Sequence, residues 1–212
     1  LSFDAIDLKG GLEMSLFRDS DHFRQIAKTR QQALNLVKQL NDEVDRRMKI
    51  LDRAGVTNIW ALDRQPTKKI LIIDEFAEIT NDETKEKVNR LLRLARFCGI
   101  YVVIATQRPT VNILPGRAKA NLTTRISFRL PTSTDSSVIL DNPEASNLPK
   151  IPGRGIYKVN ENIVFQAPYI SEGRVKDIVS YNNTNESCQQ EQSDSEPTEE
   201  QEKQDNEVIR IC

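Results

Sequence analysis

Cysteine, histidine and long apolar runs are all scarce in this chain of 212 residues. Its three cysteines lie far apart and its single histidine is His22, so no metal-ligand spacing and no disulfide framework are present. We therefore expect reduced thiols in a cytosolic compartment and an ordinary surface or boundary position for His22. No apolar run approaches the ~18 residues that a membrane-spanning helix needs, and the first residues lack the pattern of a signal peptide. Membrane-spanning and disulfide-rich secreted classes are thus not indicated.

Charge is balanced overall but distributed unevenly along the chain. The net charge is −1, yet nine acids against two bases give residues 182–212 a charge of −7, which leaves +6 for the residues before them. The terminal segment is rich in Asn, Gln, Ser and Glu and almost free of apolar residues, so it cannot bury enough surface to offset its ordering entropy. We expect residues 181–212 to be a disordered acidic tail, either a shield for a basic surface or a solubilising extension.

Helical and strand patterns alternate before this tail. Apolar residues recur in steps of three and four from Ala33 to Leu51, which predicts a helix over 30–54 that ends at Gly55. The runs "ILII" and "IYVVIAT" are short, apolar and β-branched, as in strands covered on both faces. Further strands are expected in the segments 1–7, 124–130, 155–159 and 163–167, and further helices over 81–98 and 133–140. This alternation predicts an α/β fold with a mostly parallel sheet.

Polar residues follow the apolar strands of this predicted sheet. Asp74 and Glu75 come directly after "ILII", and Gln107 follows the next strand in "ATQRP". Asp7 and Lys9 follow the first strand. Because the carboxyl ends of parallel strands meet at one edge of a sheet, Asp74, Glu75 and Gln107 should converge if the two apolar strands are neighbours.

This combination of side chains suits the hydrolysis of a nucleoside triphosphate. An aspartate at a strand tip can hold Mg²⁺, and an adjacent glutamate can polarise an attacking water. A glutamine on the neighbouring strand can bind that water or the γ-phosphate, and an arginine beyond it can stabilise transition-state charge. The alternative is that "DE" and "TQR" are merely solvated strand ends or helix caps, an explanation that would have to apply twice.

The motifs together resemble a known family. The segments "ILIIDEFAEI", "RLARFCGIYVVIATQRPTVNILPGRAKANLTTRISFRL" and "TDSSVILDNPEASNLPKIPGRGIYKV" are similar to the motor domain of the FtsK/SpoIIIE DNA translocases, and the resemblance extends over residues 1–171. It implies a RecA-like three-layer fold, ATP and Mg²⁺ as cofactors, and a homo-hexameric ring that pumps double-stranded DNA. It also implies a location on the cytoplasmic side of the bacterial membrane, with any membrane anchor outside this chain.

The resemblance assigns roles to individual residues. Asp74 is similar to the Mg²⁺-coordinating acid of the Walker B motif, and Glu75 to the catalytic base. Gln107 resembles the γ-phosphate sensor. Arg108 and Arg125 stand where the family places arginines near the nucleotide and the subunit interface, and the sequence leaves open which of them acts across that interface.

Two features depart from the family pattern. The phosphate-binding Walker A motif, G-x-x-x-x-G-K-[ST], is absent, and the first residue is Leu1. We therefore expect residues 1–180 to be the later part of a motor domain that binds ATP poorly or not at all by itself. In addition, Ser137 occupies a position where many relatives carry arginine. Either another residue takes over the role of that arginine, or the position is a tolerant helix surface.

A DNA translocase also needs cations that grip phosphates. Arg117 and Lys119 lie in a predicted loop between two strands and are candidates for this contact, although a solvated loop would look the same. The favoured hypothesis is an ATP-driven DNA translocase or conjugative coupling ATPase. The alternatives are a type VII secretion ATPase that moves protein substrates, and a truncated, non-catalytic remnant that serves as an oligomerisation module.

Overall fold

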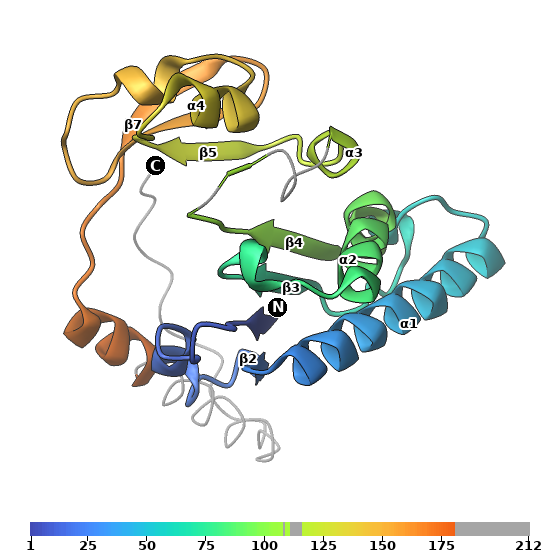
Figure 1. Cartoon of the computed structure of the whole chain (residues 1–212). Helices are drawn as coiled ribbons and strands as arrows, with labels where there is room; N and C mark the ends of the chain where they lie inside the picture. Colours follow the sequence, from blue (N-terminus) through green and yellow to red (C-terminus); the bar gives the residue numbers. More distant parts are fainter. Residues whose placement is uncertain (108, 111–115, 181–212) are drawn as a thin grey trace, which may run out of the picture.

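The computed structural model describes residues 1–107, 109–110 and 116–180. Within these residues seven strands form two sheets, one with the order β2-β1-β3-β4 and one with the order β5-β6-β7 (Figure 1). The strands are β1 (Ser2–Ile6), β2 (Phe23–Ala27), β3 (Lys69–Ile73), β4 (Ile100–Ile104), β5 (Arg125–Phe128), β6 (Arg154–Lys158) and β7 (Asn162–Gln166). The α-helices are α1 (Arg30–Ala54), α2 (Asp82–Leu94), α3 (Gly116–Lys119) and α4 (Ser133–Leu140), and residues 172–180 are also helical. Short 3₁₀ turns are η1 (Met14–Phe17), η2 (Ile59–Ala61), η3 (Phe76–Glu78), η4 (Ala95–Cys98) and η5 (Glu144–Asn147).

The first sheet is entirely parallel, which confirms the prediction from the alternating pattern. Ile73 at the end of β3 is in register with Ile6 of β1 and with Ile104 of β4. The carboxyl ends of these three strands therefore lie at the same edge of the sheet, and the two apolar strands β3 and β4 are direct neighbours as expected.

Helix α1 has the bounds that its apolar periodicity predicts. Thr29 caps its first turn by accepting a hydrogen bond from the Gln32 N–H, and Gly55 ends it with a left-handed φ of 66°. Helix α2 begins after Asn81, whose side chain accepts from the Thr84 N–H. Both helices pack on the same face of the parallel sheet. The core between these helices and the sheet is made of the buried side chains Leu36, Val37, Leu40, Val44, Leu71, Ile73, Val88, Leu91 and Ile100.

The edge strand β2 was not anticipated from the sequence. It pairs in parallel with β1, where the rings of Phe3 and Phe23 stack with centroids 5.2 Å apart. On the opposite face the Arg24 guanidinium donates three hydrogen bonds to the fully buried Asp4 at 3.1–3.3 Å. These contacts join residues about twenty positions apart, so the strand depends on its partner rather than on a local pattern.

The second sheet is antiparallel and separate from the first. The hairpin of β6 and β7 matches the sequence prediction, whereas β5 joins this hairpin instead of extending the parallel sheet. Helix α4 and η5 cover one face, where Leu140, Ala145 and Ile156 are buried together. Helix α4 starts at Ser133 as expected, and the preceding Thr132 is its cap.

Two predictions from composition concern membrane-spanning helices and the acidic tail. Within the described residues, no helix is both long and apolar enough to cross a membrane. The predicted disorder of residues 181–212 falls outside the described part of the chain.

Candidate nucleotide-hydrolysis site

The exits of β3 and β4 are tied to each other by the backbone. The Asp74 N–H donates to the carbonyl of Ile6 at 3.0 Å, and the Phe76 N–H donates to the carbonyl of Ala105 at 2.9 Å. These bonds extend the sheet pairing beyond the regular strands. They fix the pair Asp74–Glu75 between the ends of β1 and β4.

Glu75 lies at the centre of this junction, and its side chain is only 4% exposed. One carboxylate oxygen accepts a short hydrogen bond from the Thr106 hydroxyl and a 3.4 Å bond from the Ala77 N–H. The other oxygen accepts from the Gln107 backbone N–H at 3.0 Å and from the Lys9 ammonium at 3.2 Å. A single carboxylate thus holds together residues that follow three neighbouring strands.

These donors also set the charge of Glu75. Burial by itself would raise the pKa of this carboxyl group, but the hydrogen bonds from Thr106, Gln107 and Lys9 together hold its pKa below the ordinary value. Glu75 is therefore a buried, ionised carboxylate at neutral pH.

Asp74 is in the opposite electrostatic situation. Burial, and after it the nearby carboxylates of Glu13 and Asp7, raise the pKa of Asp74. Lys9 offsets this negative charge only in part. The remaining negative charge suits a divalent cation, and a carboxylate oxygen is a ligand that Mg²⁺ prefers. In the described part of the chain, no three metal-ligating side chains lie together. A protein site for Mg²⁺ can consist of one or two carboxylates completed by water and phosphate oxygens, so Asp74 fits this cation.

The residues after β4 contact Glu75 in another way than the sequence predicts, because the expected contact was the side chain of Gln107. The Gln107 side chain is exposed, and it is the backbone N–H of Gln107 that reaches Glu75. The side-chain contact comes instead from Thr106, and a second one comes from Lys9 at the end of β1. The sequence places both residues at strand ends without giving them a role. The available signal was that Thr106 directly precedes Gln107 and that Lys9 follows Asp7 by two positions.

Two predicted cations lie in a different cluster. Lys119 and Arg125 both form ion pairs with Asp141, at 2.5 and 2.6 Å, and Lys158 is a third partner at 3.2 Å. Lys119, then Arg125 and Lys158, hold the pKa of Asp141 well below its usual range. Arg125 also donates to the carbonyls of Leu122 and Ile139. None of these partners belongs to the junction around Glu75.

The other predicted positions are placed as follows. Arg108 lies outside the described residues. Arg117 belongs to the short helix α3 rather than to an open loop. Ser137 is exposed on α4, and its hydroxyl donates to the carbonyl of Ser133 within the helix.

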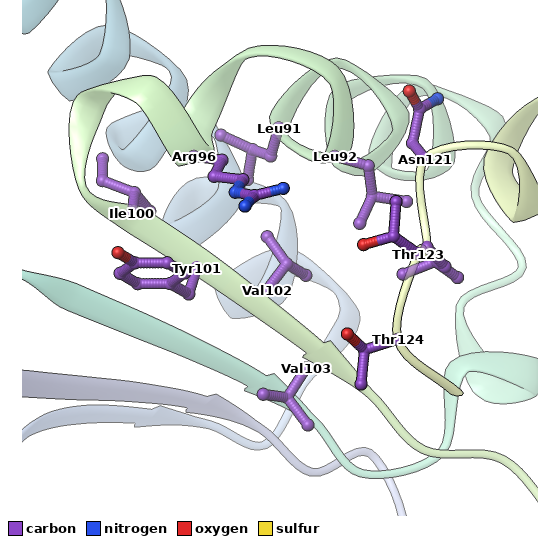
Figure 2. A pocket seen from close by; sticks show the side chains of 11 residues that line it. Leu91, Leu92, Arg96, Ile100, Tyr101, Val102, Val103, Asn121, Thr123 and Thr124 are labelled. Atoms are coloured by element: carbon purple, nitrogen blue, oxygen red, sulfur yellow. The ribbon is translucent and has the colours of Figure 1, made fainter. Parts of the chain in front are cut away.

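A groove runs along the outer edge of β4 (Figure 2). It has a volume of about 400 Å³ and is lined by Leu91, Leu92 and Arg96 on one side and by residues 121–124 on the other. In β4, the Gly99 carbonyl and the Ala105 N–H bond to β3. By the alternation of a parallel ladder, Ile100, Val102 and Ile104 therefore direct their N–H and C=O groups away from β3, and Ile100 and Val102 line the groove. Residues 121–124 lead directly into β5, and among the strands of the described residues β5 pairs with β6 alone.

The relatives found by comparison with known proteins agree with one another, since those described here are DNA translocases named FtsK. No family model matches the chain. It is 31% identical over 164 residues to the DNA translocase FtsK of Chlorobaculum tepidum, covering 71% of this chain and 20% of that protein. It is 30% identical over 193 residues to FtsK of Streptococcus pyogenes, covering 80% and 24%. The chain thus spans about a fifth to a quarter of the length of these curated relatives.

Solved structures agree with the sequence relatives. The conjugation coupling protein TcpA of pCW3, in its monomer form with ATPγS, matches with a TM-score of 0.77 and 29% identity over 87% of this chain and 56% of that one. The cytoplasmic domain of the type VII secretion ATPase EccC of Thermomonospora curvata matches with a TM-score of 0.66 and 25% identity, over 86% of this chain and 24% of that one.

The parallel sheet, its flanking helices and these likenesses define the class of protein. The chain has a RecA-like α/β fold, as the sequence predicts. More narrowly, it is a relative of the FtsK/SpoIIIE family, and the resemblance stated from its motifs is confirmed.

Proposed function

We propose that residues 1–180 are the Walker B part of an ATPase motor domain that translocates double-stranded DNA. The observation that carries this proposal is the junction at one edge of the parallel sheet, where Asp74 and Glu75 meet Thr106 and Gln107. Open α/β sheets bind ligands at this edge. The likeness to FtsK translocases and to the coupling protein TcpA supports DNA as the substrate.

Each side chain of the junction has a proposed task in hydrolysis. Asp74 holds Mg²⁺, which supplies charge neutralisation to the phosphates when bound. Glu75 orients the attacking water and accepts its proton once a lone pair is available. The exposed Gln107 side chain is free to bind the γ-phosphate or the water, while its backbone N–H anchors Glu75. Arg108 and Arg125 are proposed to stabilise transition-state charge within the subunit or across an interface.

The groove beside β4 supports a place for the phosphate-binding element. A strand lying parallel to β4 in this groove would satisfy the outward backbone groups of Ile100, Val102 and Ile104. Its carboxyl end would reach the same sheet edge as Asp74, where a glycine-rich loop can cradle phosphates. We propose that polypeptide outside residues 1–212 supplies this strand and its Gly-Lys-Ser/Thr loop.

DNA contact and assembly complete the proposal. Arg117 and Lys119 are proposed to contact DNA phosphates, in keeping with the +6 charge of the residues before the tail. The intact protein would form a homo-hexameric ring on the cytoplasmic side of the membrane, anchored only by segments outside this chain. Residues 181–212 would remain an acidic extension.

The test is the ATPase activity of the full-length gene product with and without duplex DNA. We expect stimulation by duplex, and the pair R117A and K119A should weaken it and flatten its salt dependence. The matched control is the pair K49A and R53A, which removes two exposed cations from α1 and should change neither. Unchanged stimulation in the first pair would refute the proposed DNA contact.

One alternative has support from a specific comparison. The likeness to EccC, a type VII secretion ATPase, favours a protein substrate for the same motor. Hydrolysis of ATP without any stimulation by duplex DNA would favour this alternative. A full-length gene product that binds no ATP would instead favour the non-catalytic oligomerisation module.

A further inference from the structure

The carboxylate of Glu75 has no acceptor site to spare. It accepts from Thr106 and Ala77 on one oxygen and from Gln107 and Lys9 on the other. A carboxylate offers about four lone-pair sites, so all of them are occupied. A general base must accept a proton from water, which requires at least one of these donors to leave.

The four donors differ in how easily they can leave. Those of Ala77 and Gln107 are backbone N–H groups fixed by η3 and by the exit of β4. Thr106 can withdraw its hydrogen bond only by rotating its short side chain. Lys9 is the mobile one, since its flexible side chain is 39% exposed and its ammonium lies 3.2 Å from Glu75.

We propose that Lys9 is a positioning residue that, with Thr106, holds Glu75 in a resting position and releases it when its ammonium turns to a nucleotide phosphate. This inference rests on the proposed function for the identity of the anion. The end of β1 supports it, because the Ile6 carbonyl bonds the Asp74 N–H and thus brings Lys9 beside the carboxylate assigned to Mg²⁺. An ammonium is a point charge that binds either a carboxylate or a phosphate, so an arriving phosphate competes with Glu75 for it.

The first test needs no nucleotide. In the 212-residue chain, amide hydrogen exchange is measured by NMR for Ala77 and Gln107 in the wild type, K9M and T106V. Both variants should speed exchange of these two amides roughly three- to tenfold, the effect of weakening one hydrogen bond to a charged group. The Val56 N–H, which bonds the Leu51 carbonyl at the end of α1, should not change.

The second test measures hydrolysis by the full-length gene product without DNA. K9M should raise kcat and also raise the KM for ATP, because both the restraint on Glu75 and a phosphate contact are lost. T106V should raise kcat with KM unchanged, and T106S, which keeps the hydroxyl, should restore wild-type behaviour. K38M is the matched control, because Lys38 pairs with Glu83 on the surface of the helices.

The outcomes separate this inference from the proposed function. Unchanged exchange at Ala77 and Gln107 would overturn the restraint. Faster exchange together with a lower kcat in both K9M and T106V would show that Lys9 and Thr106 hold Glu75 in its working position, and would overturn the resting position. A wild-type full-length gene product without ATPase activity would overturn the proposed function, while the exchange result would still decide the restraint.

Discussion

Arg47 ties helix α1 to the start of two strands of the parallel sheet. Its side chain is only 2% exposed, and its guanidinium donates to Glu43 at 2.6 Å, to the carbonyl of Cys98 at 2.8 Å and to the carbonyl of Thr67 at 2.7 Å. Thr67 precedes β3 and Cys98 precedes β4, so one side chain sets the position of both strands that carry the candidate site.

The substitution R47M removes this link while keeping an apolar stem of similar length. Three hydrogen bonds are lost, and two backbone carbonyls lose a partner. Breaking a buried ionic contact in this way costs about 3–5 kcal/mol of unfolding free energy. For a domain of this size such a loss lowers Tm by about 6–20 °C.

The assay is urea unfolding followed by circular dichroism, with R46M as the matched control. Arg46 pairs with the same Glu43 but is 60% exposed, so its removal should cost less than about 1 kcal/mol. If R47M and R46M differ by less than about 0.5 kcal/mol, a difference typical of surface sites, the assignment of Arg47 as a structural link is wrong.

The contacts of Glu43 with Arg46 and Arg47 predict that stability depends on pH. The hydrogen bond from Arg46, opposed by burial and aided by Arg47, lowers the pKa of Glu43 to about 2. A carboxyl pKa that is lower in the folded state adds stability above the unfolded pKa, and this stability is lost as pH falls through the folded value. Stability should therefore fall between about pH 4.5 and 2, by up to ~3 kcal/mol from this group. The variant E43Q should lose part of this slope, and an unchanged slope would contradict the prediction.

Three further outcomes are expected. The variant E75Q should lower the kcat of the full-length gene product about 10²–10⁴-fold, as removal of a general base does, and a kcat near wild type would remove Glu75 from the mechanism. G99A should destabilise the chain by about 1–3 kcal/mol in urea, because φ is 67° and the added Cβ would lie 2.2 Å from Ile59 Cδ1. D141N should strengthen duplex binding in fluorescence anisotropy and steepen its salt dependence, since the ion-paired cations would be released toward phosphates; unchanged binding would exclude them from the DNA contact.

Much of the fold follows from local patterns. Helix α1 begins and ends where its steps of three and four and Gly55 predict, because the cap and the apolar stripe both lie within the segment itself. Strands β3 and β4 are similarly fixed by apolar runs. Strand β2 is different, because "FRQIA" has no clear alternation and becomes a strand through pairing with β1 and the contact of Arg24 with Asp4.

In the candidate site too, some features follow from the local sequence pattern and others depend on residues distant in the sequence. The neighbourhood of β3 and β4 was predictable because parallel strands end at a common edge. Which group of Gln107 reaches Glu75 was not, since side-chain direction alternates along an extended chain and a shift of one residue exchanges Thr106 for Gln107. The motif "TQRP" correctly predicts the segment that contacts Glu75. Only the structure shows that the threonine of this motif, Thr106, supplies the side-chain contact.

The arginines and lysines were the least predictable part, because a cation in the sequence does not reveal its partner. Asp141 ends α4 in a left-handed conformation with φ of 63°, which turns its carboxylate toward Lys119, Arg125 and Lys158 from other elements. Three cations against one carboxylate leave this cluster with net positive charge. A phosphate could therefore bind there by replacing Asp141 as a partner, so an internal ion pair and a DNA contact are competing uses of the same side chains.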